Sequence, residues 1–133
     1  MIYLLDTNAC ISYLNHADST VREHMQEYKP EDIAICSVVE AELLFGVFKS
    51  SRPKQNMIKL KTFLNEFVSI PFDSSAALEF GRIRQSLAKL GTPIGPYDLQ
   101  IGAIALSRRL TLVTHNVREF SRVEGLHIED WES

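Results

Sequence analysis

This sequence is poor in cysteine and has no long apolar run. Cys10 and Cys36 are its only cysteines, and both lie among apolar residues, which favours two buried thiols over a disulfide or a metal site. No stretch approaches the roughly 20 apolar residues that a membrane-spanning helix needs. The carboxylate of Asp6 comes too early for the start of the chain to act as a secretory signal. We therefore expect a cytoplasmic protein without a membrane span.

An excess of positive charge is also lacking. The formal net charge is −3 and the pI is about 5.8, whereas a protein that binds nucleic acid over its whole surface needs many Lys and Arg residues to contact phosphates. Any nucleic-acid contact must therefore depend on local groups of basic residues, for which solvated helix faces are the ordinary explanation. Two such groups are present, namely Lys49, Arg52, Lys54, Lys59 and Lys61, and then Arg82, Arg84 and Lys89.

Several catalytic motifs are missing. The sequence contains no phosphate-binding loop with G-K-[ST], no G-x-G-x-x-G and no G-x-S-x-G nucleophile turn. The four histidines, His16, His24, His115 and His127, show no spacing typical of metal ligands, so surface or core positions are the ordinary expectation for them. His115 is a possible exception to this expectation, because it adjoins Asn116, a candidate site residue.

Short apolar runs alternate with helical patterns along the whole chain. Strands are predicted near residues 2–5, 33–36, 68–70, 111–114 and 126–128. Helices are predicted between them, including one that starts with a capping box at Ser37 and Glu40 and a nearly apolar one after Gly95-Pro96. This order indicates a parallel α/β sheet with helices on both faces, and 133 residues suit one domain spanning 1–133.

Four oxygen-bearing side chains fall where strands end or the following helices begin. Asp6 ends the first strand, Glu42 lies near the start of the helix after the second, Asp98 is in the first turn after Gly95-Pro96, and Asn116 follows the strand ending at Thr114. Ligands bind at this edge of open parallel sheets. Each acid also has a plain explanation: Asp6 as a helix cap, Asp98 as a partner of the helix dipole, and Glu42 as an exposed helix residue.

Three carboxylates that meet would repel one another unless a cation neutralised them. Oxygen ligands with room for water suit Mg²⁺, with Mn²⁺ as a substitute, better than zinc. We therefore predict Asp6, Glu42 and Asp98 as metal-binding residues and Asn116 as a fourth catalytic position. Thr7 and Thr114 are predicted to orient the carboxylates through hydrogen bonds, although turn positions explain them equally well.

The same residues resemble a known family. The pattern is similar to the PIN-domain ribonucleases, and most of all to the VapC toxins of type II toxin–antitoxin systems, over nearly the whole chain. The matching segments are Leu5-Asp6-Thr7-Asn8, Ser37 through Ala41-Glu42-Leu43 to Gly46, Pro96-Tyr97-Asp98, Val113-Thr114 to Asn116 with Glu119-Phe120, and Ile128-Glu129-Asp130-Trp131.

The resemblance implies a PIN-like three-layer α/β/α fold, in which a central parallel sheet of four or five short strands is flanked by helices. It further implies a Mg²⁺-dependent endoribonuclease that cuts RNA, with the anticodon stem–loop of initiator tRNA as the expected substrate, and so inhibits translation. The implied partners are a VapB-type antitoxin that places a side chain near the acidic pocket, and a second copy of the chain.

One position departs from the family pattern. Many PIN domains have a fourth acid where this chain has Asn116, and Glu119 is a candidate to take part of that role. An amide supplies an oxygen ligand without charge, so a second metal ion would be held weakly. This departure and the acidic pI leave open a catalytically inactive PIN-like binding module. A nucleotide-binding α/β domain of the response-regulator type is a more remote alternative.

The role of the large apolar side chains on the two helices near the predicted site is also open. Core packing is the ordinary expectation for Tyr13, Leu14, Phe45 and Phe48, and an antitoxin or dimer surface is the alternative.

Overall fold

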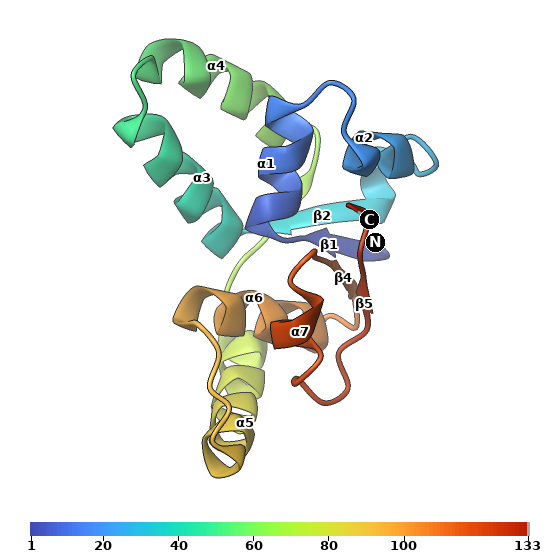
Figure 1. Cartoon of the computed structure of the whole chain (residues 1–133), viewed down its shortest axis with the longest axis vertical. Helices are drawn as coiled ribbons and strands as arrows, with labels where there is room; N and C mark the ends of the chain where they lie inside the picture. Colours follow the sequence, from blue (N-terminus) through green and yellow to red (C-terminus); the bar gives the residue numbers. More distant parts are fainter. Residues whose placement is uncertain (133) are drawn as a thin grey trace.

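The computed structural model describes residues 1–132, in which five short parallel strands form one sheet between layers of helices (Figure 1). The central strands β1, β2 and β4 are largely buried, as their continuous apolar runs predict, and the edge strands β3 and β5 are partly exposed. In chain order the elements are β1 Tyr3–Leu5, α1 Thr7–Asn15, α2 Thr20–Met25, a 3₁₀ turn Pro30–Asp32, β2 Ile33–Cys36, α3 Ser37–Lys49, α4 Pro53–Leu64, β3 Val68–Ile70, α5 Ser74–Leu90, α6 Pro96–Ser107, β4 Thr111–Val113, α7 Val117–Phe120 and β5 Ile128–Glu129.

The strand order is β3-β2-β1-β4-β5. The chain builds the sheet outward from β1 through β2 to β3, then returns to add β4 on the other side of β1, where Leu5 lies opposite Val113. The order therefore reverses between β1 and β4, and parallel sheets bind ligands at the carboxyl ends of the strands at such a point. A response-regulator domain has the order 2-1-3-4-5, so the remote alternative of that type is wrong.

Helices cover both faces of the sheet. Helices α1 to α4 lie on one face and α5 to α7 on the other, while α5 extends away from the sheet and packs against α6 (Figure 1). The nearly apolar helix predicted after Gly95-Pro96 is α6, and residues from Leu99 to Ala105 on it are buried. Its position between the sheet and α5 explains why it has no polar face. The predicted three-layer α/β/α fold is confirmed.

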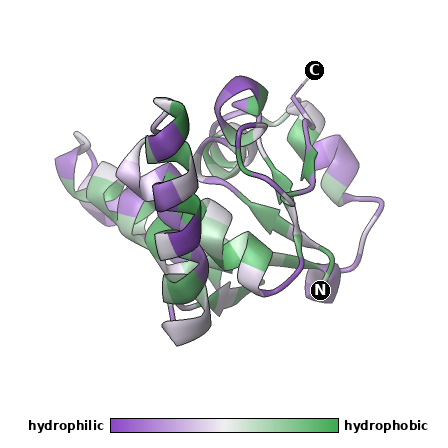
Figure 2. Cartoon of the chain, turned by 90° about the horizontal axis from the view of Figure 1, so that it is seen from below, coloured by the Kyte–Doolittle hydropathy of each residue, from purple (hydrophilic) through white to green (hydrophobic). Residues whose placement is uncertain are grey.

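The apolar residues are concentrated on the strands and on the inward faces of the helices, while most of the loops are hydrophilic (Figure 2). Trp131, which follows β5, is among the largest fully buried side chains. Both cysteines are buried free thiols, as predicted. No helix in residues 1–132 is long and apolar enough to cross a membrane.

Two helix-level predictions are wrong. Helix α3 begins at Ser37, but its N-cap is Cys36 and no side chain caps it. Instead, Ser37 accepts a hydrogen bond from the Phe72 amide at 3.3 Å, and the Glu40 carboxylate accepts a very short one from the Ser69 hydroxyl. The proposed capping box is therefore replaced by contacts that join α3 to β3 and the segment after it.

The second wrong prediction is core packing for Phe45 and Phe48, two of the four large apolar side chains near the predicted site. Tyr13 and Leu14 do pack against the core. Phe45 and Phe48, however, are exposed at 64% and 70% on the outer side of α3. They are available for contact with another molecule.

Candidate metal centre

Asp6 lies where β1 ends, at the point where the strand order reverses. Its side chain is 4% exposed, and its Oδ1 accepts a hydrogen bond of 2.8 Å from the Ala9 amide, so Asp6 also caps α1. Burial raises the pKa of Asp6 to about 6, the Asp98 charge adds to this, and hydrogen bonds from Thr114 and Ala9 oppose it. The explanation of Asp6 as a helix cap is thus confirmed. The cap does not fully compensate the buried negative charge, because the pKa of Asp6 is still raised.

Asp98 comes from the other side of the sheet, in the first turn of α6. Burial, together with the nearby charges of Glu119 and Glu42, raises its pKa to about 6. A hydrogen bond from Asn116 acts in the opposite direction. Asp6, Asp98, Glu42 and Glu119 therefore form a group of neighbouring carboxylates, named here the acidic pocket, in which a cation would be stabilised.

Glu42 is half-buried in the second turn of α3, and its Oε1 accepts a hydrogen bond of 2.7 Å from the Thr7 hydroxyl. The structure brings Glu42 to the same edge as Asp6 and Asp98, but it does not place the donor atoms of all three within 4.8 Å of one another. In residues 1–132, the carboxylates thus face one region without forming a closed set of ligands.

Asn116 directs its amide nitrogen at the acids. Its Nδ2 donates to Glu119 at 2.9 Å, and a hydrogen bond from Asn116 also lowers the pKa of Asp98. The second oxygen of Glu119 accepts the Gly95 amide at 2.8 Å, and Gly95 is the N-cap of α6. Glu119 therefore joins the turn after β4 to the start of the helix that carries Asp98. The Glu119 carboxylate thus holds together the two segments that carry Asp98 and Asn116. This role depends on a contact between distant residues, so the sequence could not show it.

The two predicted orienting threonines are both in place. Thr7 binds Glu42, as described, and Thr114 hydrogen-bonds to Asp6. The Thr114 hydroxyl also accepts a hydrogen bond of 3.0 Å from the Asn116 backbone amide. Thr114 is therefore both a turn residue and a support for Asp6.

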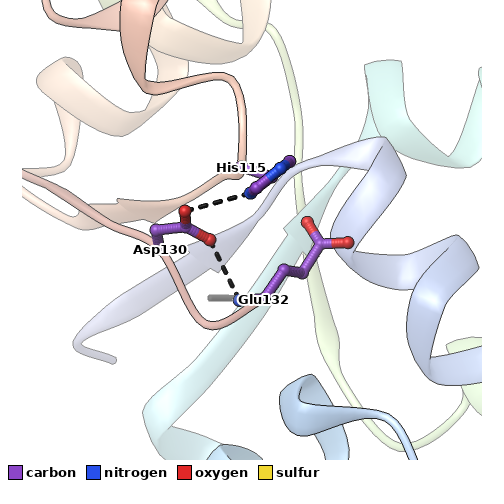
Figure 3. Close-up of side chains that lie close together, drawn as sticks. All are labelled: His115, Asp130 and Glu132. Atoms are coloured by element: carbon purple, nitrogen blue, oxygen red, sulfur yellow. Dashed lines mark hydrogen bonds and ion pairs between the residues drawn. The ribbon is translucent and has the colours of Figure 1, made fainter.

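Sequence reasoning missed a neighbouring group of ligand-type side chains, His115, Asp130 and Glu132. Their donor atoms all lie within 4.8 Å of one another (Figure 3). Asp130 and Glu132 follow β5 directly, just as Asp6 follows β1. The signal that could have found them was the acidic ending around Trp131, which was read only as part of the family pattern.

A parallel α/β sheet with polar side chains gathered at the carboxyl ends of its strands, where the strand order reverses, is typical of ligand-binding and catalytic α/β proteins. The PIN domain family model matches residues 3–126. Among curated relatives, the tRNA(fMet)-specific endonuclease VapC of Salmonella typhimurium is 39% identical over 129 residues, covering 97% of each chain. Ribonuclease VapC2 of Rickettsia felis is 41% identical over 133 residues, covering 99% of each.

A solved structure agrees with these relatives. The VapC chain in the crystal structure of DNA-bound VapBC from Salmonella typhimurium superposes with a TM-score of 0.94, at 38% identity and with 98% of each chain covered. The chain belongs to the PIN-domain family and, within it, to the VapC proteins.

Proposed function

We propose that this chain is the toxin of a VapBC-type toxin–antitoxin pair and hydrolyses RNA phosphodiester bonds as a metal-dependent endoribonuclease. The relatives named above are nucleases, and the pocket at Asp6 and Asp98 supplies the expected kind of site. The observation that supports the proposal most strongly is that Asp6 and Asp98, which come from separate segments, meet at the edge where the strand order reverses. Burial and neighbouring charges accordingly raise the pKa of both carboxyls to about 6. Such a pocket is poorly stable when empty and charged, and it favours a cation.

The residues present fit Mg²⁺, with Mn²⁺ as a substitute. Asp6 and Asp98 offer the hard oxygen donors that Mg²⁺ prefers. When bound, such an ion lowers the pKa of a coordinated water and neutralises charge that builds up on the phosphate. We assign Asp6 and Asp98 as the residues that would hold it.

Glu42 has a different task in this proposal. Because Thr7 fixes one of its oxygens and the three carboxylates do not form a closed set, Glu42 is better placed to orient the attacking water and accept its proton. Asn116 and Thr114 hold Asp98 and Asp6 through hydrogen bonds. The side-chain amide of Asn116 acts here as a hydrogen-bond donor and offsets part of the local negative charge. A fourth acid at this position would instead add to that charge.

The substrate proposal is RNA, with initiator tRNA as the first choice because VapC of Salmonella typhimurium is named as specific for it. A cavity of about 290 Å³ leads from Glu42 between α1, α3 and α4, and Asn56 and Lys59 line it. A lysine on this wall is suited to contact a backbone phosphate. The negative net charge of the chain makes such a local basic contact important.

The proposed partner is a VapB-type antitoxin, since related chains were crystallised as VapBC complexes. The exposed Phe45 and Phe48 on the outer side of α3 offer an apolar surface that an antitoxin segment would cover. We also propose that the chain forms a homodimer and acts in the cytoplasm, where tRNA is available. The proposed single domain spans residues 1–133, of which Ser133 lies outside the described residues.

Cleavage of purified tRNA tests the proposal. The chain is freed from its antitoxin and incubated with initiator tRNA and Mg²⁺, and the cut ends are mapped by primer extension. We expect cleavage in the anticodon stem–loop, loss of cleavage with EDTA, and loss by more than about 100-fold in Asp98→Asn. Asp18→Asn is a matched control, because Asp18 is exposed on a loop.

A folded Asp98→Asn chain that cuts at the normal rate would contradict the assignment. A chain that neither cuts any RNA nor binds Mn²⁺ would instead support the inactive binding module.

A further inference from the structure

A second group of possible ligands lies beside the acidic pocket, beyond the carboxyl ends of β4 and β5. His115 follows β4, and Asp130 and Glu132 follow β5. One ring nitrogen and two carboxylate oxygens lie within 4.8 Å of one another. Figure 3 shows the three side chains converging from the two segments, an arrangement that suits a shared metal ion.

Two contacts hold the group in place. Asp130 Oδ2 lies 3.0 Å from His115 Nδ1, and Asp130 Oδ1 accepts the Glu132 amide at 2.9 Å. Asp130 is therefore fixed between the other two residues, and its carboxylate orients the imidazole. On metal binding His115 would lose the proton of the coordinating ring nitrogen, and Asp130 would bind the ion as a neighbouring ligand.

A simple ion pair explains only part of the group. His115 and Asp130 would form a surface ion pair by themselves. Glu132 needs another explanation, because its Oε2 is completely buried and has no hydrogen-bond partner among residues 1–132. A buried carboxylate oxygen without a donor is costly, and a bound cation would remove that cost.

We propose that His115, Asp130 and Glu132 bind a first-row transition metal ion, with Zn²⁺ as the best candidate. One imidazole nitrogen and two carboxylate oxygens, with room left for water, are a donor set that Zn²⁺ accepts in tetrahedral sites. Mg²⁺ strongly prefers oxygen donors alone, so the two adjoining sites would select different ions.

The bound ion would connect the segment after β5 to the turn after β4. That turn also carries Thr114 and Asn116, which hold Asp6 and Asp98. The site therefore lies where it can stiffen the support of the acidic pocket. It also adds positive charge near Asp6, whose pKa responds to Glu132.

Zn²⁺ titration by calorimetry tests the site without depending on nuclease activity. The full chain is used with Asp6→Asn and Asp98→Asn, so that the acidic pocket cannot supply the binding. We expect one Zn²⁺ per chain, and a loss of affinity of at least about tenfold when His115→Gln or Glu132→Gln is added. His127→Gln is the matched control, because His127 is exposed and outside the group.

Two further measurements make the result decisive. Circular dichroism confirms that each variant is folded, and histidine ring signals in NMR spectra identify which imidazole responds to Zn²⁺. A shift of the His115 ring alone supports the proposal. Folded chains that bind no Zn²⁺, or bind it equally well with and without His115→Gln and Glu132→Gln, would overturn it. Neither outcome bears on RNA cleavage, which is measured separately on the unsubstituted pocket.

Discussion

The Thr7 hydroxyl donates to the Glu42 carboxylate across 2.7 Å and so joins the first turn of α1 to α3. Thr7 directly follows Asp6. The residues just after β1 therefore supply both a carboxylate of the acidic pocket and the hydrogen bond that supports Glu42. This contact therefore orients the Glu42 carboxylate relative to Asp6, in addition to the packing of α1 against α3.

Replacing Thr7 with valine keeps the shape of the side chain and removes this hydrogen bond. We expect Thr7→Val to slow RNA cleavage by about 10- to 100-fold, because Glu42 then loses its fixed orientation. Thr7→Ser, which keeps the hydroxyl, should cleave within a fewfold of the original rate. Single-turnover rates with Mg²⁺ measure the difference, and equal rates for the valine and serine variants would refute the role.

Glu119 is expected to matter through the two backbone segments it connects. Glu119→Ala removes the acceptor for both Gly95 and Asn116. We expect the free energy of unfolding to fall by about 1 kcal/mol, since these contacts are partly open to solvent, and cleavage to fall as well. Urea denaturation measures the first effect. Glu124→Ala, at an exposed position on the following loop, should leave both properties unchanged.

Much of this architecture follows from local patterns. The buried strand predicted at residues 33–36 and the short strand predicted near residues 68–70 appear as β2 and β3 with the same bounds. Asp73 caps α5 and Gly91 ends it in a left-handed conformation, as a polar cap and a glycine before a proline indicate. The last strand begins two residues later than expected, at Ile128, because a two-residue edge strand gives too weak a pattern to locate.

The contacts that local patterns missed are those between distant segments. Glu40 pairs with Ser69 across 29 positions, so the local capping box could not be distinguished from a tertiary contact. The site shows the same limit: strand ends predicted that Asp6, Glu42 and Asp98 share one edge. They could not reveal that Glu119 reaches Gly95, or that Asp130 meets His115, because both depend on how loops fold over the sheet.

The stability of the metal-free chain should depend on pH through Asp6. Burial raises the pKa of this carboxyl from 3.8 to about 6, so the folded state binds the proton more tightly than the unfolded chain does. The stabilisation is fully present below about pH 4 and is lost as the pH rises through 6. In EDTA, Asp6→Asn should therefore gain stability relative to the original chain between pH 4.5 and 7.5, by about 2 kcal/mol.

Urea denaturation at the two pH values measures this gain, and Asp18→Asn serves as the control because Asp18 is exposed. Mg²⁺ at pH 7.5 should stabilise the original chain and have a much smaller effect on Asp6→Asn. A gain that is the same at both pH values would show that the carboxyl is not destabilised when charged.

Trp131 holds the segment after β5 against the rest of the protein. It is 2% exposed. Its ring lies 4.9 Å from that of Tyr3 and 5.3 Å from that of His24, with Tyr28 stacked at 5.8 Å. Removing the indole leaves a cavity in an aromatic cluster, so Trp131→Ala should lower the free energy of unfolding by about 3–5 kcal/mol. Trp131→Phe should cost less, because a ring still fills most of the space.

Fluorescence makes the same point directly, because Trp131 is the only tryptophan in the chain. Its emission should be that of a buried indole and should shift to longer wavelength only on global unfolding, since its partners come from β1, α2 and the loop after α2. Because Asp130 and Glu132 flank this anchor, their donor atoms are held in place only while the indole stays buried. Emission typical of a water-exposed indole in the native chain would mean that this segment is loose, and that the anchoring role of Trp131 is wrong.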